Sequence, residues 1–280
     1  MIIEEFHPFL PYLYTVLVIG GIICFGREVI RHFKGENVQT FSGLTSWTLR
    51  PLDLSLIIVF IYLVVFGAGT LTVEGYKYFL KVKEVPEDHF FIFGFPMHIA
   101  ILGCLYGFFR YFDITYEKPI NPVHQGIART LGLAIYYFFA IIPLLLAVGY
   151  LWPMLLELLQ LPTAHQDLVD QVRGMDLGPM FYTIAFLAVI LAPISEELLF
   201  RAFIYRALKN YMPSLLSAII TSLMFALMHF NLLSFLPLFL LGFWLSRTYE
   251  KSGNIWVPIL LHALFNGNTL VTLMLTGPEA

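Results

Sequence analysis

Uninterrupted apolar stretches recur along this 280-residue chain, and they constrain its fold more than any other feature. The stretch 131–151, for example, contains no Asp, Glu, Lys or Arg. A helix of roughly 20 apolar residues can cross the hydrocarbon core of a bilayer with all of its backbone hydrogen bonds satisfied internally. Charged residues make up 12% of the chain, whereas a soluble domain carries about 25%. The sequence therefore predicts a multi-pass integral membrane protein, which we expect in the cell membrane.

The apolar segments predict an all-α, polytopic bundle of about eight transmembrane helices in a single membrane domain, 1–280. Residues 1–152 supply the N-terminal spans, and residues 179–275 supply the spans that carry the polar motifs described below. We expect the stretch 160–176 to be a solvated connector, with a substrate gate as the alternative. The predicted spans are 9–25, 54–73, 90–109, 131–151, 179–210, 214–230, 233–247 and 255–275.

Charge and cysteine usage exclude several classes of protein. The formal net charge is −3, and no basic stripe is interleaved with aromatic residues, so nucleic acid is not an expected partner. Cys24 and Cys104 both lie in apolar stretches, which leaves neither a disulfide framework nor a CxxC metal site.

Two carboxylates and an arginine interrupt the apolar pattern at Glu196, Glu197 and Arg201, directly after the uncharged stretch 181–195. Ionisable side chains at membrane depth are costly unless they are paired or line a wet cavity, so they are functional candidates. Glu197 and Arg201 are four residues apart on one helical face and can form an ion pair. The alternative is a purely structural ion pair.

The segment 192–197 predicts a break in the helix followed by a fresh helix start. Pro193 lacks a backbone N–H, and Ser195 is a good N-cap residue. Both glutamates would then lie in the first helical turn, where the macrodipole favours a carboxylate and the apolar surroundings disfavour it. A glutamate in that balance is poised to exchange protons.

Polar residues in two later spans fall at a compatible depth. A tight turn near 211–214 brings His229 level with Glu196 within about one helical turn, so the two side chains can hold a water between them. His262 and Asn266 are four apart on one helical face, and both can donate hydrogen bonds to a developing oxyanion. Hydrogen-bonded packing is the alternative role for each of these residues. We expect that packing role for His98 and Asn231, although both could line the same cavity.

A catalytic zinc site is the sharpest competing interpretation, because His229, His262 and one glutamate could supply a His2Glu ligand set. The HExxH motif is absent, however, and Asn266 would have no role in such a site. We therefore expect neither a metal nor another cofactor.

The motifs EExxxR at 196–201, FxxxH at 225–229 and HxxxN at 262–266 occur in that order on late predicted spans. Together they resemble the CAAX protease and bacteriocin-processing (CPBP, or Abi) family of intramembrane glutamic endopeptidases. The resemblance covers about the last 100 residues, and the three motifs together are specific although each alone is weak. The first 150 residues show only generic spans.

The resemblance implies a metal-independent peptidase and a role for each motif residue. Glu196 matches the glutamate that activates water with His229. Glu197 and Arg201 match the residues that hold the site, and His262 and Asn266 match the oxyanion-stabilising pair.

The implied substrate is a membrane-associated peptide or protein, with or without an attached lipid, as in the trimming of prenylated CaaX proteins. The alternative class is a non-catalytic membrane protein that uses the same polar cluster to bind or transport a peptide or a lipid.

Overall fold

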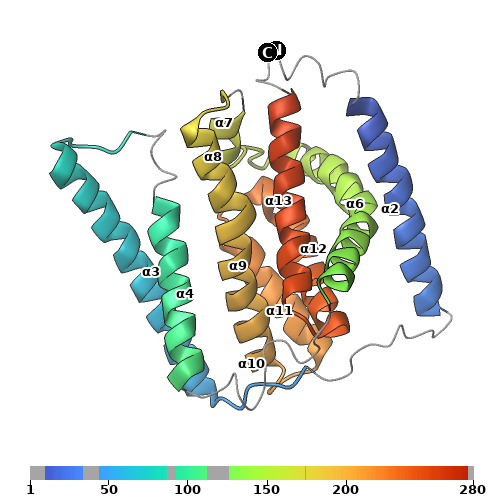
Figure 1. Cartoon of the computed structure of the whole chain (residues 1–280), viewed down its shortest axis with the longest axis horizontal. Coiled ribbons are helices and arrows are strands. Elements are labelled where there is room, and N and C mark those ends of the chain that lie inside the picture. Colours follow the sequence, from blue (N-terminus) through green and yellow to red (C-terminus); the bar gives the residue numbers. More distant parts are fainter. Residues whose placement is uncertain (1–9, 34–43, 87–92, 112–125, 174, 277–280) are drawn as a thin grey trace.

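The computed structural model describes residues 10–33, 44–86, 93–111, 126–173 and 175–276 of the chain. Within these ranges the protein is built from helices that pack into one bundle (Figure 1). The principal helices are α2 (Leu10–Phe33), α3 (Pro51–Leu80), α4 (Gly94–Tyr111), α6 (Ile127–Leu158), α11 (Ser214–Leu227), α12 (Leu232–Ser252) and α13 (Trp256–Thr276), together with a continuous helix from Pro179 to Leu208.

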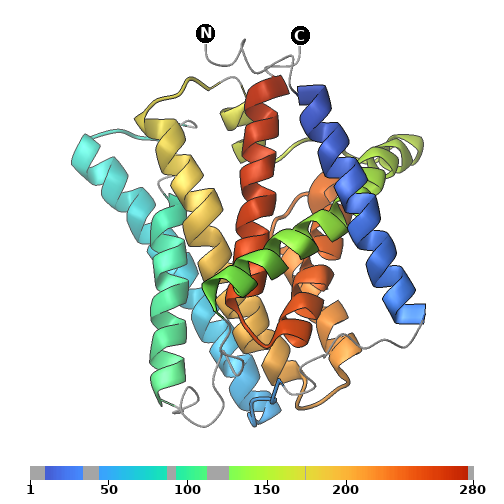
Figure 2. The same cartoon turned by 45° about the vertical axis from the view of Figure 1, so that its right-hand side comes forward.

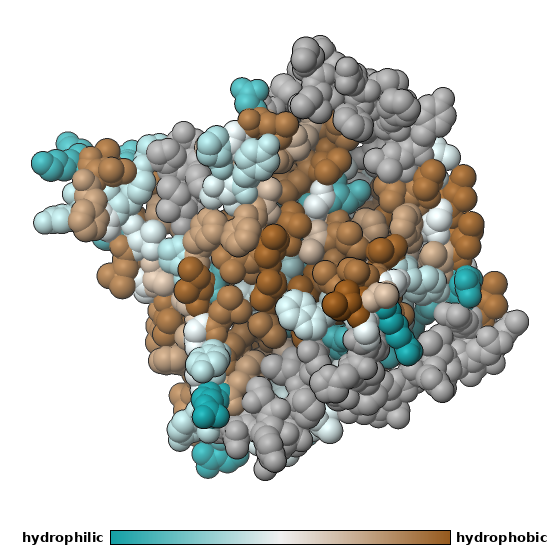
Figure 3. Space-filling view, in the orientation of Figure 1, coloured by the Kyte–Doolittle hydropathy of each residue, from teal (hydrophilic) through white to brown (hydrophobic). Residues whose placement is uncertain are grey.

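The predicted all-α membrane bundle is confirmed. Each of the eight predicted spans overlaps a helix in the described residues, and the predicted starts at Phe9 and Phe90 lie outside them. The predicted span 214–230 runs past the end of α11 at Leu227, so His229 lies in the turn that follows this helix. Five of the described helices are long and apolar enough to cross a membrane, and α11, with 14 residues, is shorter. Hydrophobic residues cover most of the described face in Figure 3, as contact with acyl chains requires.

The helices are arranged so that the N-terminal spans flank a C-terminal core. In Figure 1, α3 and α4 pack together at one side, and α2 lies at the other. Helix α6 packs against α2 and also against α12 and α13, and Figure 2 shows how obliquely it crosses them. The continuous helix 179–208 lies between α4 and α13, so it is enclosed from both sides.

This central helix alternates between α-helical and π-helical turns. Its segments are α8 (Pro179–Phe186), η3 (Leu187–Leu191), α9 (Ala192–Glu197), η4 (Leu198–Tyr205) and α10 (Arg206–Leu208), where η marks a π-helix. The break predicted at 192–197 therefore takes another form: the backbone remains helical, and Pro193 is accommodated by the π-helical turn before it. As a consequence, both glutamates lie within a continuous helix and not in a first turn.

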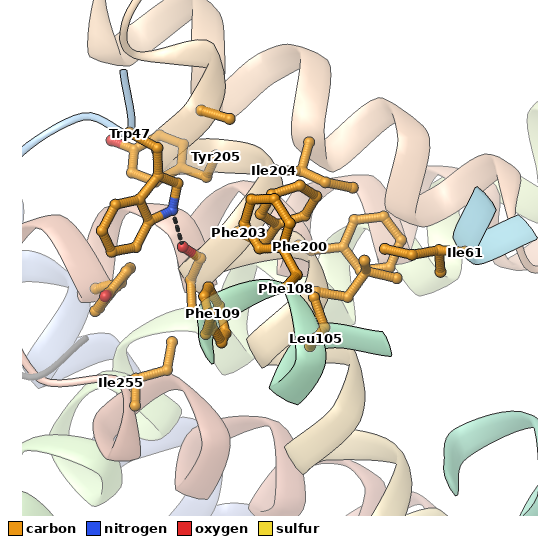
Figure 4. Close-up of a cluster of buried hydrophobic side chains, with 14 of the residues drawn as sticks. Trp47, Ile61, Leu105, Phe108, Phe109, Phe200, Phe203, Ile204, Tyr205 and Ile255 are labelled. Atoms are coloured by element: carbon orange, nitrogen blue, oxygen red, sulfur yellow. Dashed lines mark hydrogen bonds between the residues drawn. The ribbon is translucent and has the colours of Figure 1, made fainter. Parts of the chain in front are cut away.

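The segment 44–50 anchors the end of this helix through Trp47, which is only 1% exposed. The Trp47 indole N–H donates to the carbonyl of Ala202 at 2.7 Å, and the guanidinium of Arg206 stacks over the indole at 3.6 Å. Figure 4 shows the indole beside Phe203, Phe109 and Tyr205 in the largest buried cluster. A segment between two spans thus fixes the helix just after the polar motif.

The connector 160–176 is mostly exposed or half-buried in its described residues, as predicted for a solvated connector, with Val172 as the buried exception. It contains the short helix α7 (Asp167–Val172), and Val172 is buried against Phe181, Leu270 and Leu273. The predicted packing role of Asn231 is confirmed: its side chain caps α12 by accepting from the Ser234 N–H and donates to the carbonyl of Ala164 at 2.9 Å.

Candidate active site

The core of the site is an ion pair that is completely removed from solvent. Glu197 and Arg201, predicted to pair, have 0% side-chain exposure and are joined at 2.7 Å. The other terminal nitrogen of Arg201 donates to the carbonyl of Gly242 in α12 at 3.0 Å. Gly242 permits this close approach, because an added Cβ would lie 3.1 Å from that nitrogen, tighter than most real Cβ contacts. A buried ion pair persists only when further hydrogen bonds compensate for the loss of water, and the Gly242 carbonyl provides one.

His262 links both glutamates. Its Nδ1 lies 2.9 Å from Oε1 of Glu197, and its Nε2 lies 3.9 Å from Oε2 of Glu196. Because a carboxylate oxygen accepts hydrogen bonds, Nδ1 of His262 carries the hydrogen in its contact with Glu197. The other ring nitrogen, Nε2, then faces Glu196. Glu196 retains 18% side-chain exposure, in contrast to the buried Glu197. Of the two carboxylates, Glu196 is therefore the one accessible to a water molecule.

The aromatic ring of Phe225 in α11 contacts both histidines. The centroid of the Phe225 ring lies 5.0 Å from that of His229 and 5.7 Å from that of His262, and both contacts have edge-to-face geometry. Nδ1 of His229 lies 2.8 Å from the Phe225 carbonyl, so it donates, and the neutral ring keeps its lone pair on Nε2. No direct hydrogen bond or ion pair joins His229 to Glu196 among the interactions of the described residues.

Asn266 occupies a position that the sequence of the central helix explains. In η3 the N–H of Ala192 bonds to the carbonyl of Leu187, five residues back. The next bond of this pattern would run from residue 193 to Ala188, but Pro193 has no N–H to donate. The side-chain amide of Asn266 donates to the Ala188 carbonyl instead, at 2.7 Å. Its second N–H is not used in this bond, so Asn266 can both hold the helix and donate elsewhere.

His98 reaches the same helix from α4. Its Nδ1 lies 2.6 Å from the hydroxyl oxygen of Ser195, the residue directly before Glu196. Ser195 is fully buried, and its hydroxyl also bonds to the carbonyl of Ala192 at 3.1 Å. The predicted hydrogen-bonded role of His98 is confirmed, and its partner places it beside the polar motif.

The structure thus brings Glu196, Glu197, Arg201 and His262 into direct contact, and it places His229 beside them through the ring of Phe225. Asn266 contacts the same helix at the carbonyl of Ala188, a residue that lies about two turns before the glutamates. Among the described residues, no group of three or more His, Cys, Asp or Glu side chains is arranged to hold a metal ion.

Sequence reasoning did not identify the contacts that depend on tertiary packing. The Gly242 carbonyl and the Ser195 hydroxyl were not expected as partners of Arg201 and His98. The signal for Asn266 was present in the sequence, since Pro193 removes a donor from the π-helical pattern.

Comparison with known proteins supports the predicted resemblance. Residues 178–268 match the family model "Type II CAAX prenyl endopeptidase Rce1-like". The chain is 29% identical over 113 residues to the Bacillus subtilis (strain 168) protein named "Putative membrane peptidase YdiL". This alignment covers 40% of this chain and 43% of the relative.

Two further relatives match, neither with a named activity. An "Uncharacterized 24.3 kDa protein" of Escherichia coli is 41% identical over 78 residues, covering 26% of this chain and 36% of the relative. The "UPF0177 protein YxdF" of Lactococcus lactis subsp. lactis (strain IL1403) is 29% identical over 143 residues, covering 49% of this chain and 77% of the relative. The chain thus spans less than half the length of the first two relatives. No solved structure matches it.

The matched segment 178–268 contains all three polar motifs and the ion pair that they build. The chain is a multi-pass integral membrane protein, and its residues 178–268 match the model of the Rce1-like type II CAAX prenyl endopeptidase family, in agreement with the resemblance of its motifs.

Proposed function

We propose that this protein is an intramembrane peptidase that hydrolyses a peptide bond with a water molecule activated by Glu196. The observation that carries the proposal is the cluster formed by Glu196, Glu197, Arg201 and His262, in which one carboxylate is accessible and the other is locked in an ion pair. A structural ion pair alone would need neither the second glutamate nor the histidine that links them. The match to a peptidase family and to a relative named as a membrane peptidase supports the same conclusion.

In the proposed mechanism Glu196 acts as a general base. Its carboxylate removes a proton from water, and the oxygen attacks the carbonyl carbon of the scissile bond. His229 presents its free Nε2 as the second acceptor for that water, because its Nδ1 is held by the Phe225 carbonyl. When the carbon–nitrogen bond breaks, Glu196 returns the proton to the departing nitrogen. No covalent intermediate with the enzyme and no metal ion takes part in these steps.

The remaining residues hold the base and stabilise the negative charge that develops on the carbonyl oxygen. Arg201 and His262 hold the carboxylate of Glu197 in place. Because Glu196 is the preceding residue on the same helix, its position is restrained as well. Asn266 offers the amide hydrogen that is not donated to Ala188. Together with the His262 imidazole, this hydrogen forms the proposed oxyanion-stabilising pair, and such donors contribute about 10²- to 10³-fold each in other enzymes.

The proposed substrate is a peptide or protein within or beside the bilayer, with or without an attached lipid, and the proposed location is the cell membrane. The matching family is described as a CAAX prenyl endopeptidase family, which is the basis for considering a prenylated substrate.

The test compares purified wild-type protein with Glu196→Gln and His229→Ala on a peptide library that includes farnesylated CaaX peptides. We expect Glu196→Gln to lower kcat by about 10²- to 10⁴-fold, as loss of a general base does. Glu250→Gln is the matched control, because the Glu250 side chain is also 18% exposed and pairs with Lys209.

The same experiment separates the alternatives. Cleavage that persists unchanged in both variants, or no cleavage of any peptide by the wild type, would favour a non-catalytic binder or transporter. Cleavage that a chelator abolishes would favour a zinc peptidase that uses His229, His262 and a glutamate.

A further inference from the structure

His98 lies in α4, outside the segment 178–268 that the family model covers, and yet it bonds to the residue before the proposed general base. Two features fit α4 closely against the central helix. Gly94, one turn before His98, approaches so near that an added Cβ would lie 2.5 Å from the Leu187 side chain. The rings of Phe95 and Phe186 stack at 6.2 Å. The His98 contact therefore belongs to a tightly packed helix pair.

The direction of the His98 hydrogen bond follows from its partner. The Ser195 hydroxyl has one hydrogen, and it is directed at the Ala192 carbonyl, 3.1 Å away. The Ser195 oxygen must then accept from His98, so Nδ1 of His98 carries a hydrogen. The two bonds connect α4 through one buried hydroxyl to the backbone of α9.

This connection acts on a short α-helical segment between two π-helical ones. Segment α9 has only six residues. A change between α-helical hydrogen bonds, which span four residues, and π-helical hydrogen bonds, which span five, rotates every following side chain around the helix axis. Ser195 is adjacent to Glu196, so a side chain that fixes Ser195 also fixes the direction in which Glu196 points.

We propose that His98 is a positioning residue: by donating to Ser195 it holds α9 in the register that aims Glu196 into the site. The inference rests on the proposed function, since it assigns His98 to the orientation of the same general base. His98 has no proposed contact with the water or the substrate. A shift of the base by a fraction of an ångström is sufficient for an effect, because well-aligned reacting groups contribute steeply to rate.

Side-chain amides provide variants that distinguish the two ring nitrogens of His98. The substitution His98→Asn places an amide nitrogen the same number of bonds from Cβ as Nδ1 of the imidazole. The substitution His98→Gln places that nitrogen one bond farther, nearer to the position of Nε2. The substitution His98→Phe removes the donor and keeps a ring.

The assay measures kcat and KM on a quenched, farnesylated CaaX peptide with the protein in detergent micelles. We expect His98→Phe and His98→Gln to lower kcat about 10-fold with KM unchanged, and His98→Asn to restore most of kcat. Ser195→Ala should give a similar loss, and adding His98→Phe to it should cause no further loss, since both changes remove one interaction. Tyr136→Phe is the control, because it removes a bond of similar length, 2.9 Å, between α6 and Glu28 of α2.

Three outcomes would overturn the proposal. Wild-type kcat in His98→Phe would remove the positioning role, and multiplicative losses in the double variant would show that His98 does not act through Ser195. Rescue by His98→Gln but not by His98→Asn would assign the role to Nε2. Glu196→Gln is included in the same series: if it cleaves like the wild type, the proposed function fails, whereas if only the His98 variants do so, this inference alone fails.

Discussion

The orphaned carbonyl of Ala188 leads to a double-mutant test that separates two roles of Asn266. Pro193 cannot donate to this carbonyl, and the Asn266 amide does so at 2.7 Å. In Asn266→Ala the carbonyl loses this donor, which costs about 1–3 kcal/mol for a buried group. Hydrogen bonds between membrane helices average about 0.6 kcal/mol and reach about 1.7. We therefore expect a destabilisation of about 1–2 kcal/mol.

The second change, Pro193→Ala, gives residue 193 the N–H that the π-helical pattern lacks. In that background the Ala188 carbonyl has a donor from its own helix, so the stability cost of Asn266→Ala should fall to near zero. The loss of kcat should persist, however, if Asn266 also donates to the oxyanion. Loss of one such donor lowers kcat by about 10²- to 10³-fold.

The measurement is unfolding by SDS in mixed micelles, followed by circular dichroism, on the wild type, both single variants and the double variant, with kcat determined on the same preparations. Asn231→Ala is the matched control. Its amide also donates to a carbonyl, that of Ala164 at 2.9 Å, and it shares no partner with Pro193. Its stability cost should therefore be the same in both backgrounds.

Two results would refute the reasoning. An equal stability cost of Asn266→Ala with and without Pro193 would show that the Ala188 carbonyl is not the group that Asn266 satisfies. A kcat in the double variant equal to that of Pro193→Ala would show that Asn266 holds the helix and takes no part in stabilising the oxyanion.

Three further predictions concern the packing around the ion pair. Arg201→Met leaves the buried Glu197 carboxylate without its cation and should destabilise the protein by about 3–5 kcal/mol, measured by SDS unfolding; a loss below about 1 kcal/mol would contradict full burial of the pair. Gly242→Ala places a methyl group 3.1 Å from the Arg201 guanidinium and should lower both stability and kcat. Gly149→Ala is the control and should be tolerated, because there is open space around Gly149. Equal effects of the two substitutions would argue against the close approach at Gly242. Trp47→Phe removes the donor to the Ala202 carbonyl and should lower stability by about 1 kcal/mol and also lower kcat. Trp244→Phe, which removes an indole hydrogen bond of 3.0 Å to the Tyr137 carbonyl, should lower stability alone. An unchanged kcat in Trp47→Phe would show that the Trp47 contact does not affect the site.

The positions of the membrane helices could be predicted from the sequence because the physics that sets them is local. An apolar run of sufficient length must form a helix in lipid, whatever surrounds it. The same applies to the pair Glu197 and Arg201, since a spacing of four residues fixes their proximity on any helix. The hydrogen bond from Arg201 to the carbonyl of Gly242 depends on how closely η4 and α12 pack, and it has no local signature in the sequence.

The π-helical turns could not be predicted from hydropathy, because a change from four-residue to five-residue hydrogen bonds alters no residue type. Pro193 and Ser195 are typical of a helix start, and that rule holds when water or a cap satisfies the freed groups. Here Asn266 supplies the donor for the freed Ala188 carbonyl from a neighbouring helix, and the Ser195 hydroxyl bonds to His98 and to the Ala192 carbonyl, so the helix continues through Pro193. The local signal was correct about the missing donor, and tertiary contacts decided its consequence.

The ring of Phe225 explains why three motifs that are separated in sequence form one site. Its face lies 4.6 Å from the Arg201 guanidinium, which suits a cation–π interaction that strengthens where water is excluded. The same ring contacts His229 and His262 in edge-to-face geometry. Each motif therefore contributes one polar group to a single aromatic side chain. Because Phe225 is 0% exposed and packed against all three groups, the ion pair, His229 and His262 are held in one fixed arrangement.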